Sequence, residues 1–307
     1  MRKIKKKDVY MKQKYTLFWI VVETFSLLFC YMTIEDRKQL QATAFQETGF
    51  FIQCEEPKGV YTYSLEEYLT HMMLAIKQVE AKEYPEAYKA LAVVCRTMLW
   101  QEWERQGRSP CIEVTGIPSI TLEEYKRLEK NAIQNYRIEL ARQAVSETAF
   151  LILDTGDTIG YCSLSNGKAR AYQSDSYVVC DYDRKNKEYY HEKRISGKEL
   201  QKKLSTNTDA SLWKIQKDAA GYVERVILED QSVMRGEEIR KKLSLFSDDW
   251  EIRKDEDDYL FCTRGLGHGY GLSIAYSQIL AANEKSYEEI LKIFFPQNHL
   301  ERRTVRE

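Results

Sequence analysis

The chain has 307 residues, of which 43% are hydrophobic and 12% aromatic, a composition that supports a substantial core and excludes a disordered or low-complexity protein. Its formal net charge is −1, but residues 1–14 carry seven Lys or Arg and one Asp, so the remainder is net acidic. An acidic body argues against nucleic-acid binding, because neutralising phosphates requires a basic face. We therefore expect no nucleic acid among the partners.

A long apolar run follows the basic head. Residues 15–34 read YTLFWIVVETFSLLFCYMTI and contain one charged side chain, Glu23. A helix of about 20 apolar residues spans the roughly 30 Å hydrocarbon core of a bilayer, and lysines tend to stay on the cytoplasmic side. The sequence thus predicts a single-pass protein of the cell membrane, with a cytoplasmic tail (1–14), a transmembrane anchor (15–34) and an extracytoplasmic remainder. A cleaved signal peptide is the main alternative.

Six of the seven cysteines would then lie outside the cytoplasm, where disulfides can form. They are scattered, with no CxxC spacing and no Cys/His cluster, so free buried thiols agree with the sequence as well as disulfides do. Their disulfide state stays open at this point. We expect no metal site and no other cofactor.

The remainder reads as a tether (35–60), one domain (61–297) and a C-terminal tail (298–307). Helix starts are indicated where Ser or Thr is followed three residues later by Glu. These pairs are Ser64 with Glu67, Thr121 with Glu124, Ser196 with Glu199, and Ser286 with Glu289. Strand-like runs lie between them at 148–154, 158–164, 222–228 and 258–264, with hairpin turns expected at 155–157 and 218–221. The predicted fold class is α+β, a single mixed helix and sheet ectodomain behind the N-terminal transmembrane helix.

The most regular predicted element is a helix over residues 85–105. Apolar residues recur in it at helical spacing and mark a buried face. Lys89 and Arg96 are seven residues apart, which places them two turns apart on one side. Such a pair forms either a solvated face or two cations aimed together at an anionic or polar substrate.

Residues 263–273, TRGLGHGYGLS, place four of the 14 glycines on alternate positions around His268. If this run is extended, the glycines leave one face of the backbone bare, and another chain, either protein or glycan, can approach it closely. A neutral imidazole at His268 could bond a sugar hydroxyl or orient a carboxylate, or it could be a structural side chain bonded to the backbone.

Two stretches resemble a known family. Residues 64–97, SLEEYLTHMMLAIKQVEAKEYPEAYKALAVVCRT, resemble the opening of the stage II sporulation protein D / amidase-enhancer domain, with its motifs E-Y-L, A-A-E-M-P and E-A-L-K-A-Q-A-V-A-A-R-T. Residues 263–296 are similar to its close, where G-R-G-x-G-H-G-x-G-M-S-Q precedes G-K-S-Y-E-E-I-L. The residues between agree more loosely, in the same order.

The resemblance implies a membrane-anchored, peptidoglycan-remodelling protein of sporulation that acts during engulfment. The best known members are lytic transglycosylases, which cleave peptide-free glycan strands and leave 1,6-anhydro-muramic ends. The implied partners are peptidoglycan glycan strands, a cell-wall amidase and other membrane-anchored sporulation proteins.

The resemblance also implies a site. Its substrate-binding positions fall on Lys89, Arg96, Ser163, Ser165, Arg264, His268, Gly269 and Ser273.

The acid of the family's A-A-E-M-P motif has no aligned carboxylate in this chain. Alignment from the preceding block places Ile76 there, and alignment from the following block places Gln78 there. Glu80 is the candidate for a displaced catalytic acid. Three hypotheses follow: a lytic transglycosylase with a displaced acid, a catalytically impaired glycan-binding or amidase-activating module, and a structural member of a membrane complex.

Overall fold

The computed structural model describes residues 50–304 except 77–82, 157 and 173. Within that part of the chain, no helix combines the length and apolar character needed to cross a membrane. The predicted tail and anchor and the candidate acid Glu80 lie outside the described residues.

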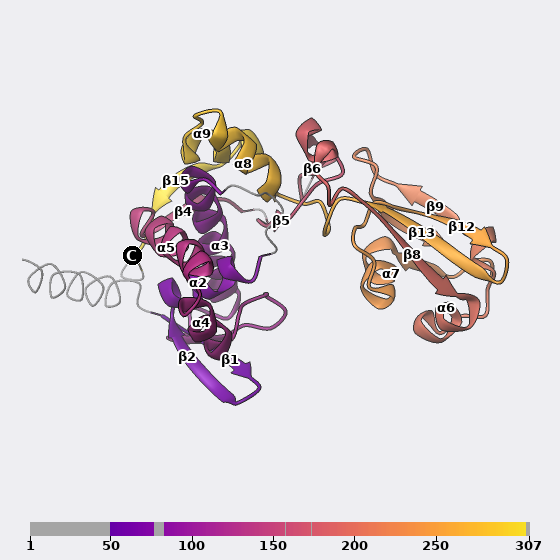
Figure 1. Cartoon of the computed structure of the whole chain (residues 1–307), viewed down its shortest axis with the longest axis horizontal. Coiled ribbons are helices and arrows are strands. Elements are labelled where there is room, and N and C mark those ends of the chain that lie inside the picture. The colour runs from indigo at the N-terminus through magenta and orange to yellow at the C-terminus, as the bar shows by residue number, and fades with distance from the viewer. Residues whose placement is uncertain (1–49, 77–82, 157, 173, 305–307) are drawn as a thin grey trace, which may run out of the picture. The chain divides into compact units, whose positions relative to one another are not determined.

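Helices and strands both occur throughout the described chain, in runs of like elements and without regular alternation, which confirms the predicted α+β class (Figure 1). The helices are α2 (Leu65–Leu74), α3 (Pro85–Arg105), α4 (Leu122–Glu129), α5 (Ala132–Glu147), α6 (Gly197–Leu204), α7 (Gly236–Leu243), α8 (Ile274–Ala282) and α9 (Tyr287–Phe294), with 3-10 turns η1 (Asp181–Lys185) and η2 (Ala210–Leu212). The strands are β1 (Phe51–Glu56), β2 (Gly59–Ser64), β3 (Cys111–Glu113), β4 (Leu151–Asp154), β5 (Tyr161–Cys162), β6 (Lys168–Arg170), β7 (Tyr177–Val179), β8 (Tyr190–Ser196), β9 (Lys214–Lys217), β10 (Val223–Ile227), β11 (Val233–Arg235), β12 (Trp250–Asp255), β13 (Asp258–Arg264), β14 (Leu272–Ser273) and β15 (His299–Arg302).

The predicted helix starts are confirmed. Ser64, Thr121 and Ser286 each cap a helix through the reciprocal bonds of a capping box, with Glu three residues later. Ser196 also caps its helix by accepting from the backbone N–H of Glu199. The predicted helix 85–105 coincides with α3. These signals act within one helical turn, so the sequence alone is sufficient to place them.

Strand predictions met a mixed outcome. The runs 222–228 and 258–264 become β10 and β13, and the turn at 218–221 joins β9 to β10 as expected. The run 158–164 contributes only the two residues of β5. The hairpin predicted at 155–157 is wrong, because β4 pairs with β15 and β5 pairs in parallel with β14.

The predicted limits of the domain also differ from the structure. The β1–β2 hairpin reaches into the predicted tether 35–60, and β1 pairs in parallel with β3. At the other end β15 lies within the predicted tail and pairs with β4. Both segments are held by backbone hydrogen bonds to the body, so the compact unit includes them as well as the predicted domain.

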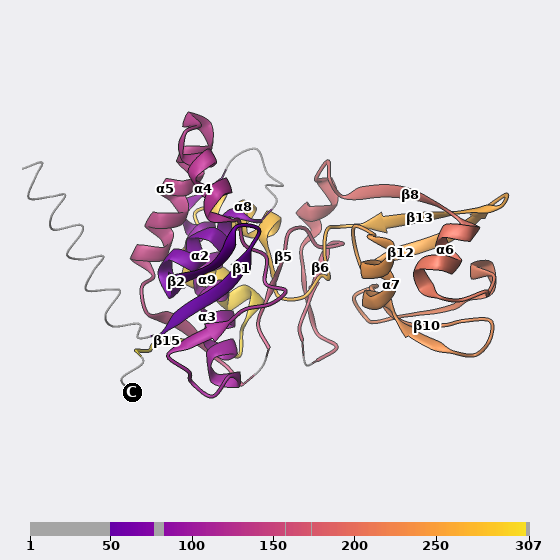
Figure 2. The same cartoon turned by 90° about the horizontal axis from the view of Figure 1, so that it is seen from below.

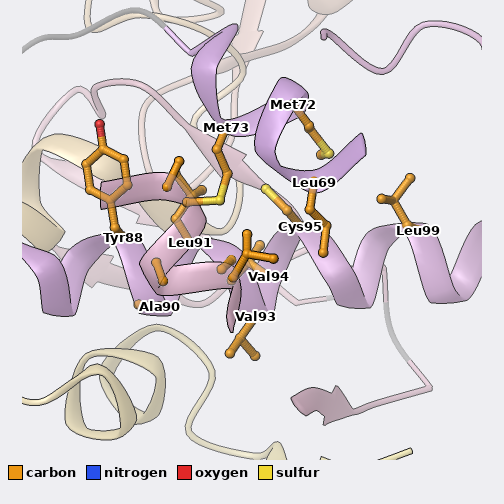
Figure 3. Packing of buried hydrophobic residues seen from close by; sticks show 14 of the residues in the cluster. Leu69, Met72, Met73, Tyr88, Ala90, Leu91, Val93, Val94, Cys95 and Leu99 are labelled. Carbon is orange, nitrogen blue, oxygen red and sulfur yellow. The ribbon is translucent and has the colours of Figure 1, made fainter. Parts of the chain in front are cut away.

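Two large hydrophobic cores lie in the described part of this unit, beside a small cluster of Leu164, Leu266 and Ala275. The larger is built from β1, β2, α2, α3, α5, α8 and α9, and Figure 3 shows Leu69 and Met73 of α2 packing toward Leu91 and Cys95 of α3. The smaller is built between α6, α7 and the strands β8, β10, β12 and β13 (Figure 2). The chain passes from the first core to the second and returns to the first at β14.

Arg96 is buried inside the first core, with 1% of its surface exposed. Its guanidinium donates to both carboxylate oxygens of Glu66 on α2, at 3.1 and 2.7 Å. Its remaining N–H groups donate to the carbonyls of Val145 in α5, Thr148 and Leu151 in β4. All five donors of the side chain are therefore used within the protein.

The next residue strengthens the same junction. Thr97 donates its hydroxyl to the carbonyl of Val93 and accepts the backbone N–H of Leu153 in β4. The adjacent arginine and threonine of α3 thus hold α2, α5 and β4 together through hydrogen bonds that are fully or partly buried.

Replacing Arg96 with Met should lower the free energy of unfolding by about 3–5 kcal/mol, because Glu66 and three carbonyls would lose their buried partner. Urea denaturation followed by circular dichroism measures this loss. Arg105→Met, on the same helix but at an arginine whose side chain is 71% exposed, is the control and should cost less than about 1 kcal/mol. Equal losses in the two variants would contradict the structural role of Arg96.

Candidate functional site

The serine-containing turn (residues 163–167) lies beside the glycine-rich segment (residues 265–271). Leu164 and Leu266 exchange backbone hydrogen bonds, and β5 pairs with β14 at the end of the segment. Further along, Arg170 donates its backbone N–H to the carbonyl of Gly269 at 2.8 Å. The structure therefore brings Ser163, Ser165, His268, Gly269 and Ser273 into one region.

Two of the predicted serines donate to one buried carboxylate. Asp183 in η1 is 1% exposed and accepts the hydroxyls of Ser165 and Ser273, each at 2.6 Å, together with the Ser165 backbone N–H. Both serines are fully buried. Ser163 is half-buried, so the hydroxyls of Ser163 and Ser165 do not share one exposed face.

His268 is half-buried beside the rings of Tyr172 and Tyr270. Its Nδ1 accepts the backbone N–H of Tyr270 at 3.0 Å, so the neutral ring carries its proton on Nε2. Burial, together with the nearby Arg240 and Arg170, lowers the pKa of His268 to about 4. The imidazole is therefore neutral at physiological pH and offers a single N–H donor.

Arg170 is a site residue that the sequence did not indicate. It is 6% exposed and donates to the carbonyl of His268 and to the carboxylates of Asp218 and Asp248. Its guanidinium lies over the rings of Tyr222 and Tyr270, 4.4 and 3.8 Å from their centroids. In the sequence, Arg170 stands only as a cation between two alanines, in residues 168–171, KARA. This pattern does not indicate which carboxylates Arg170 would contact.

A second polar contact ties the serine-containing turn to the smaller core. The Asn166 side chain donates to Asp249 and to the carbonyl of Ala220, both at 3.0 Å. Asp249 also accepts from Lys217 at 2.7 Å and lies 3.8 Å from Arg264. Arg264 itself donates to Glu251 at 3.0 Å, so this predicted binding residue is engaged at the edge of the region.

The glycine-rich segment is not an extended strand. All four of its glycines have positive φ, from 74° to 100°, so the predicted alternation of faces is wrong. A methyl group at position 269 would overlap the ring of Tyr222, and one at position 271 would overlap the carbonyl of Gly160. The bare backbone at these two glycines therefore admits neighbouring protein.

Comparisons of the sequence with known proteins identify relatives of this chain. A sequence model of a family described as "Stage II sporulation protein" matches residues 55–154. Stage II sporulation protein D of Bacillus subtilis (strain 168) is 26% identical over 257 residues, covering 78% of this chain and 74% of the relative. The protein of that name from Bacillus amyloliquefaciens is 26% identical over 257 residues, covering 77% and 74%. These similarities support a divergent relationship of this chain to the stage II sporulation protein D family.

The two cations at family positions of α3 face carboxylates of this chain. Lys89 lies 2.7 Å from both Glu86 and Glu147, and these partners raise its pKa. Arg96 is buried against Glu66. The interpretation of two cations aimed together at a substrate therefore does not describe this structure, because each is bound by carboxylates on α2, α3 or α5.

Of the two positions that alignment offers for the family's acid, Ile76 is 8% exposed and belongs to the larger core, and Gln78 lies outside the described residues. Glu83 is the other carboxylate of the segment that contains Glu80, and its side chain is 8% exposed. It accepts from the hydroxyl of Tyr88 at 2.6 Å and from Arg137 at 3.2 Å. Residues 81–85, AKEYP, share Ala, Glu and Pro with the family motif A-A-E-M-P. Alignment from either flanking block nevertheless places the motif's acid at another position, Ile76 or Gln78.

Gly269→Ala should destabilise the protein by about 1–3 kcal/mol more than Gly107→Ala. Both glycines have φ of +74°, but only position 269 has a neighbour that an added methyl group would meet. The backbone strain is thus matched, and the difference measures the clash with Tyr222. Denaturant unfolding of both variants checks it, and equal stabilities would contradict the packing described for this segment.

His268 should remain neutral from pH 8 down to about 5, with an NMR titration midpoint near 4. Because this lies below the ordinary value of about 6.5, the unfolded chain binds more protons between these two pH values. The contribution of His268 to stability is therefore present above about pH 6.5 and is lost as the pH falls toward 4. His268→Asn assigns the resonance, and a midpoint above 6 would contradict the buried environment.

Proposed function

We propose that this protein is a membrane-anchored cell-wall protein of sporulation that binds peptide-free glycan strands without cutting them. The anchor is the apolar run at residues 15–34, and the domain would face the wall. The observation that carries the proposal is that the family's site positions are engaged in internal contacts. The two possible alignments place Ile76 or Gln78 where the family has its acid, and neither side chain is a carboxylic acid; Ile76 is also buried.

Cutting a glycosidic bond requires a carboxylic acid that donates a proton to the leaving oxygen. Ile76 cannot donate one. Glu83 accepts hydrogen bonds from Tyr88 and Arg137, which is the opposite role. The structure thus supports binding over cleavage.

Binding would use the aromatic group formed by Tyr172, His268 and Tyr270. All three side chains are half-buried, and the rings of Tyr172 and Tyr270 stack at 4.6 Å. Aromatic rings pack on the apolar faces of other rings. Arg170 and Tyr172 cover the two faces of the Tyr270 ring, so a sugar would pack on Tyr172 and meet Tyr270 at its edge. The Nε2–H of neutral His268 would donate to a sugar hydroxyl.

A second candidate is the lytic transglycosylase, with Glu83 or Glu80 as a displaced acid. Two features of Glu83 favour this second candidate. Its side chain is nearly buried, and it directly precedes Tyr84 and Pro85, as the acid of the family motif precedes Met and Pro. In that case a rearrangement would have to release Glu83 from Arg137. A cell-wall amidase and other sporulation proteins remain predicted partners of either form.

The full chain in nonionic detergent should bind peptide-free glycan strands in a co-sedimentation assay and release no anhydro-ended fragments detectable by mass spectrometry. His268→Asn keeps an acceptor for the Tyr270 N–H but removes the ring, so affinity should fall about three- to tenfold. This corresponds to about 0.7–1.4 kcal/mol. His299→Asn, at an exposed histidine, is the control and should bind like the wild type.

Anhydro-ended products from the wild type would overturn the non-cutting proposal. Glu83→Gln and Glu80→Gln would then identify the acid, because only the variant that lacks it should stop releasing products. Unchanged binding by His268→Asn would remove the aromatic group as the binding surface.

A further inference from the structure

A hollow lies between the turn of the β1–β2 hairpin and α4, and no residue of the glycine-rich segment lines it. It encloses about 480 Å³. Tyr61 and Lys58 line it from the hairpin, and Lys126, Arg127 and Lys130 line it from α4 and its C-terminal end. We call it the basic pocket.

The carboxylates around the basic pocket are held by other partners. Glu56 accepts both the backbone N–H of Leu122 and the hydroxyl of Tyr63. Glu124 completes the capping box at the start of α4, and Glu129 binds Arg142 at 2.9 Å. Glu56 and Glu129 are thus engaged with groups outside the four cations of the pocket. The pKa of Glu124 is lowered mainly by its hydrogen bonds to Thr121 and also by the charge of Arg127, so it offsets that cation only in part.

Lys126, Arg127 and Lys130 are exposed, and no ion pair joins them to another residue in the described part of the chain. Lys126 and Lys130 are four residues apart, so like charges repel across one helical turn. The helix dipole favours cations at this end by about 0.3–1 kcal/mol each, but it does not explain why Lys58 converges on them from the hairpin.

Lys58 can also exchange its partner. It lies 2.7 Å from Glu123, with the two side chains 66% and 69% exposed. Such a surface ion pair contributes little to stability, so an anionic ligand that binds Lys58 more strongly can replace Glu123. Four cations can therefore turn toward one anionic ligand.

We propose that the basic pocket binds phosphodiester groups. A guanidinium such as Arg127 binds phosphate through two parallel hydrogen bonds, while lysines act as point charges around it. The ring of Tyr61 supplies an apolar wall for the carbon backbone that joins the phosphates. Two sources share this chemistry, an anionic glycerol-phosphate polymer and a phosphatidylglycerol headgroup. The proposal does not depend on glycan binding at the aromatic group.

The test titrates the full chain in nonionic detergent at low salt with two soluble probes. One is a glycerol-phosphate oligomer, and the other is dihexanoyl-phosphatidylglycerol below its micellar concentration. The triple variant Lys126→Gln, Arg127→Gln, Lys130→Gln should bind at least one probe about tenfold more weakly than the wild type. The basic residues 1–14 are present in both proteins, so the difference reports the pocket alone.

Lys241→Gln with Lys242→Gln is the control, because it removes two lysines that pair with Glu237 and Glu238 on α7. Its affinity should stay within twofold of the wild type. Pocket-dependent binding of the oligomer assigns a polymer ligand, and that of the lipid assigns a headgroup. Absence of wild-type binding, a triple variant within twofold of the wild type, or an equal loss in the control would overturn the proposal.

Discussion

The larger core depends on the pairing of one buried cation, Arg96. Removing a guanidinium from water costs several kcal/mol, and the cost is met only when its donors find partners inside the protein. Glu66 supplies the charge, and carbonyls from the end of α5 and from β4 supply the remaining acceptors. Because these partners come from three separate segments, Arg96 fixes their positions together. The arginine and threonine of the family motif in α3 therefore have a structural task in this chain.

The same constraint organises the region of the glycine-rich segment. Arg170 is buried between two tyrosine rings and paired with Asp218 and Asp248, and burial raises the pKa of Asp248 while Arg240 and Arg170 oppose that shift. Backbone must approach closely for these contacts to form. Gly269 and Gly271 permit the approach, because their missing side chains leave room for Tyr222 and Gly160. The glycine-rich segment, whose sequence suggested a binding site, thus also allows the buried polar contacts of Arg170 to form.

The sequence was informative where the determining contacts are local. Capping residues and the apolar period of α3 act within a few residues, and they placed the helices correctly. Pairings such as β4 with β15 join segments almost 150 residues apart, and no local pattern specifies them. The alternating glycines suggested a strand, since alternation has period two, but positive φ at each glycine breaks that geometry. The resemblance to the family assigned Ser165, Ser273 and His268 to one site. It could not show that Asp183 accepts hydrogen bonds from the two serine hydroxyls.

Ile76 explains how a domain can keep this architecture without an acid at the family position. Burying an isoleucine side chain contributes roughly 1.5–3 kcal/mol, whereas a carboxyl at a site 8% exposed would need a hydrogen-bonding partner to avoid a desolvation cost. The exchange therefore favours folding at that position. The serines, glycines and Arg96 are different, because each is bonded or packed against several segments. Replacing them would cost stability whether or not the protein cleaves glycan. The need for a stable fold can therefore keep most of the motif residues even if the protein no longer cleaves glycan. In the proposed function, the half-buried aromatic group is then the part of the site that contacts a ligand.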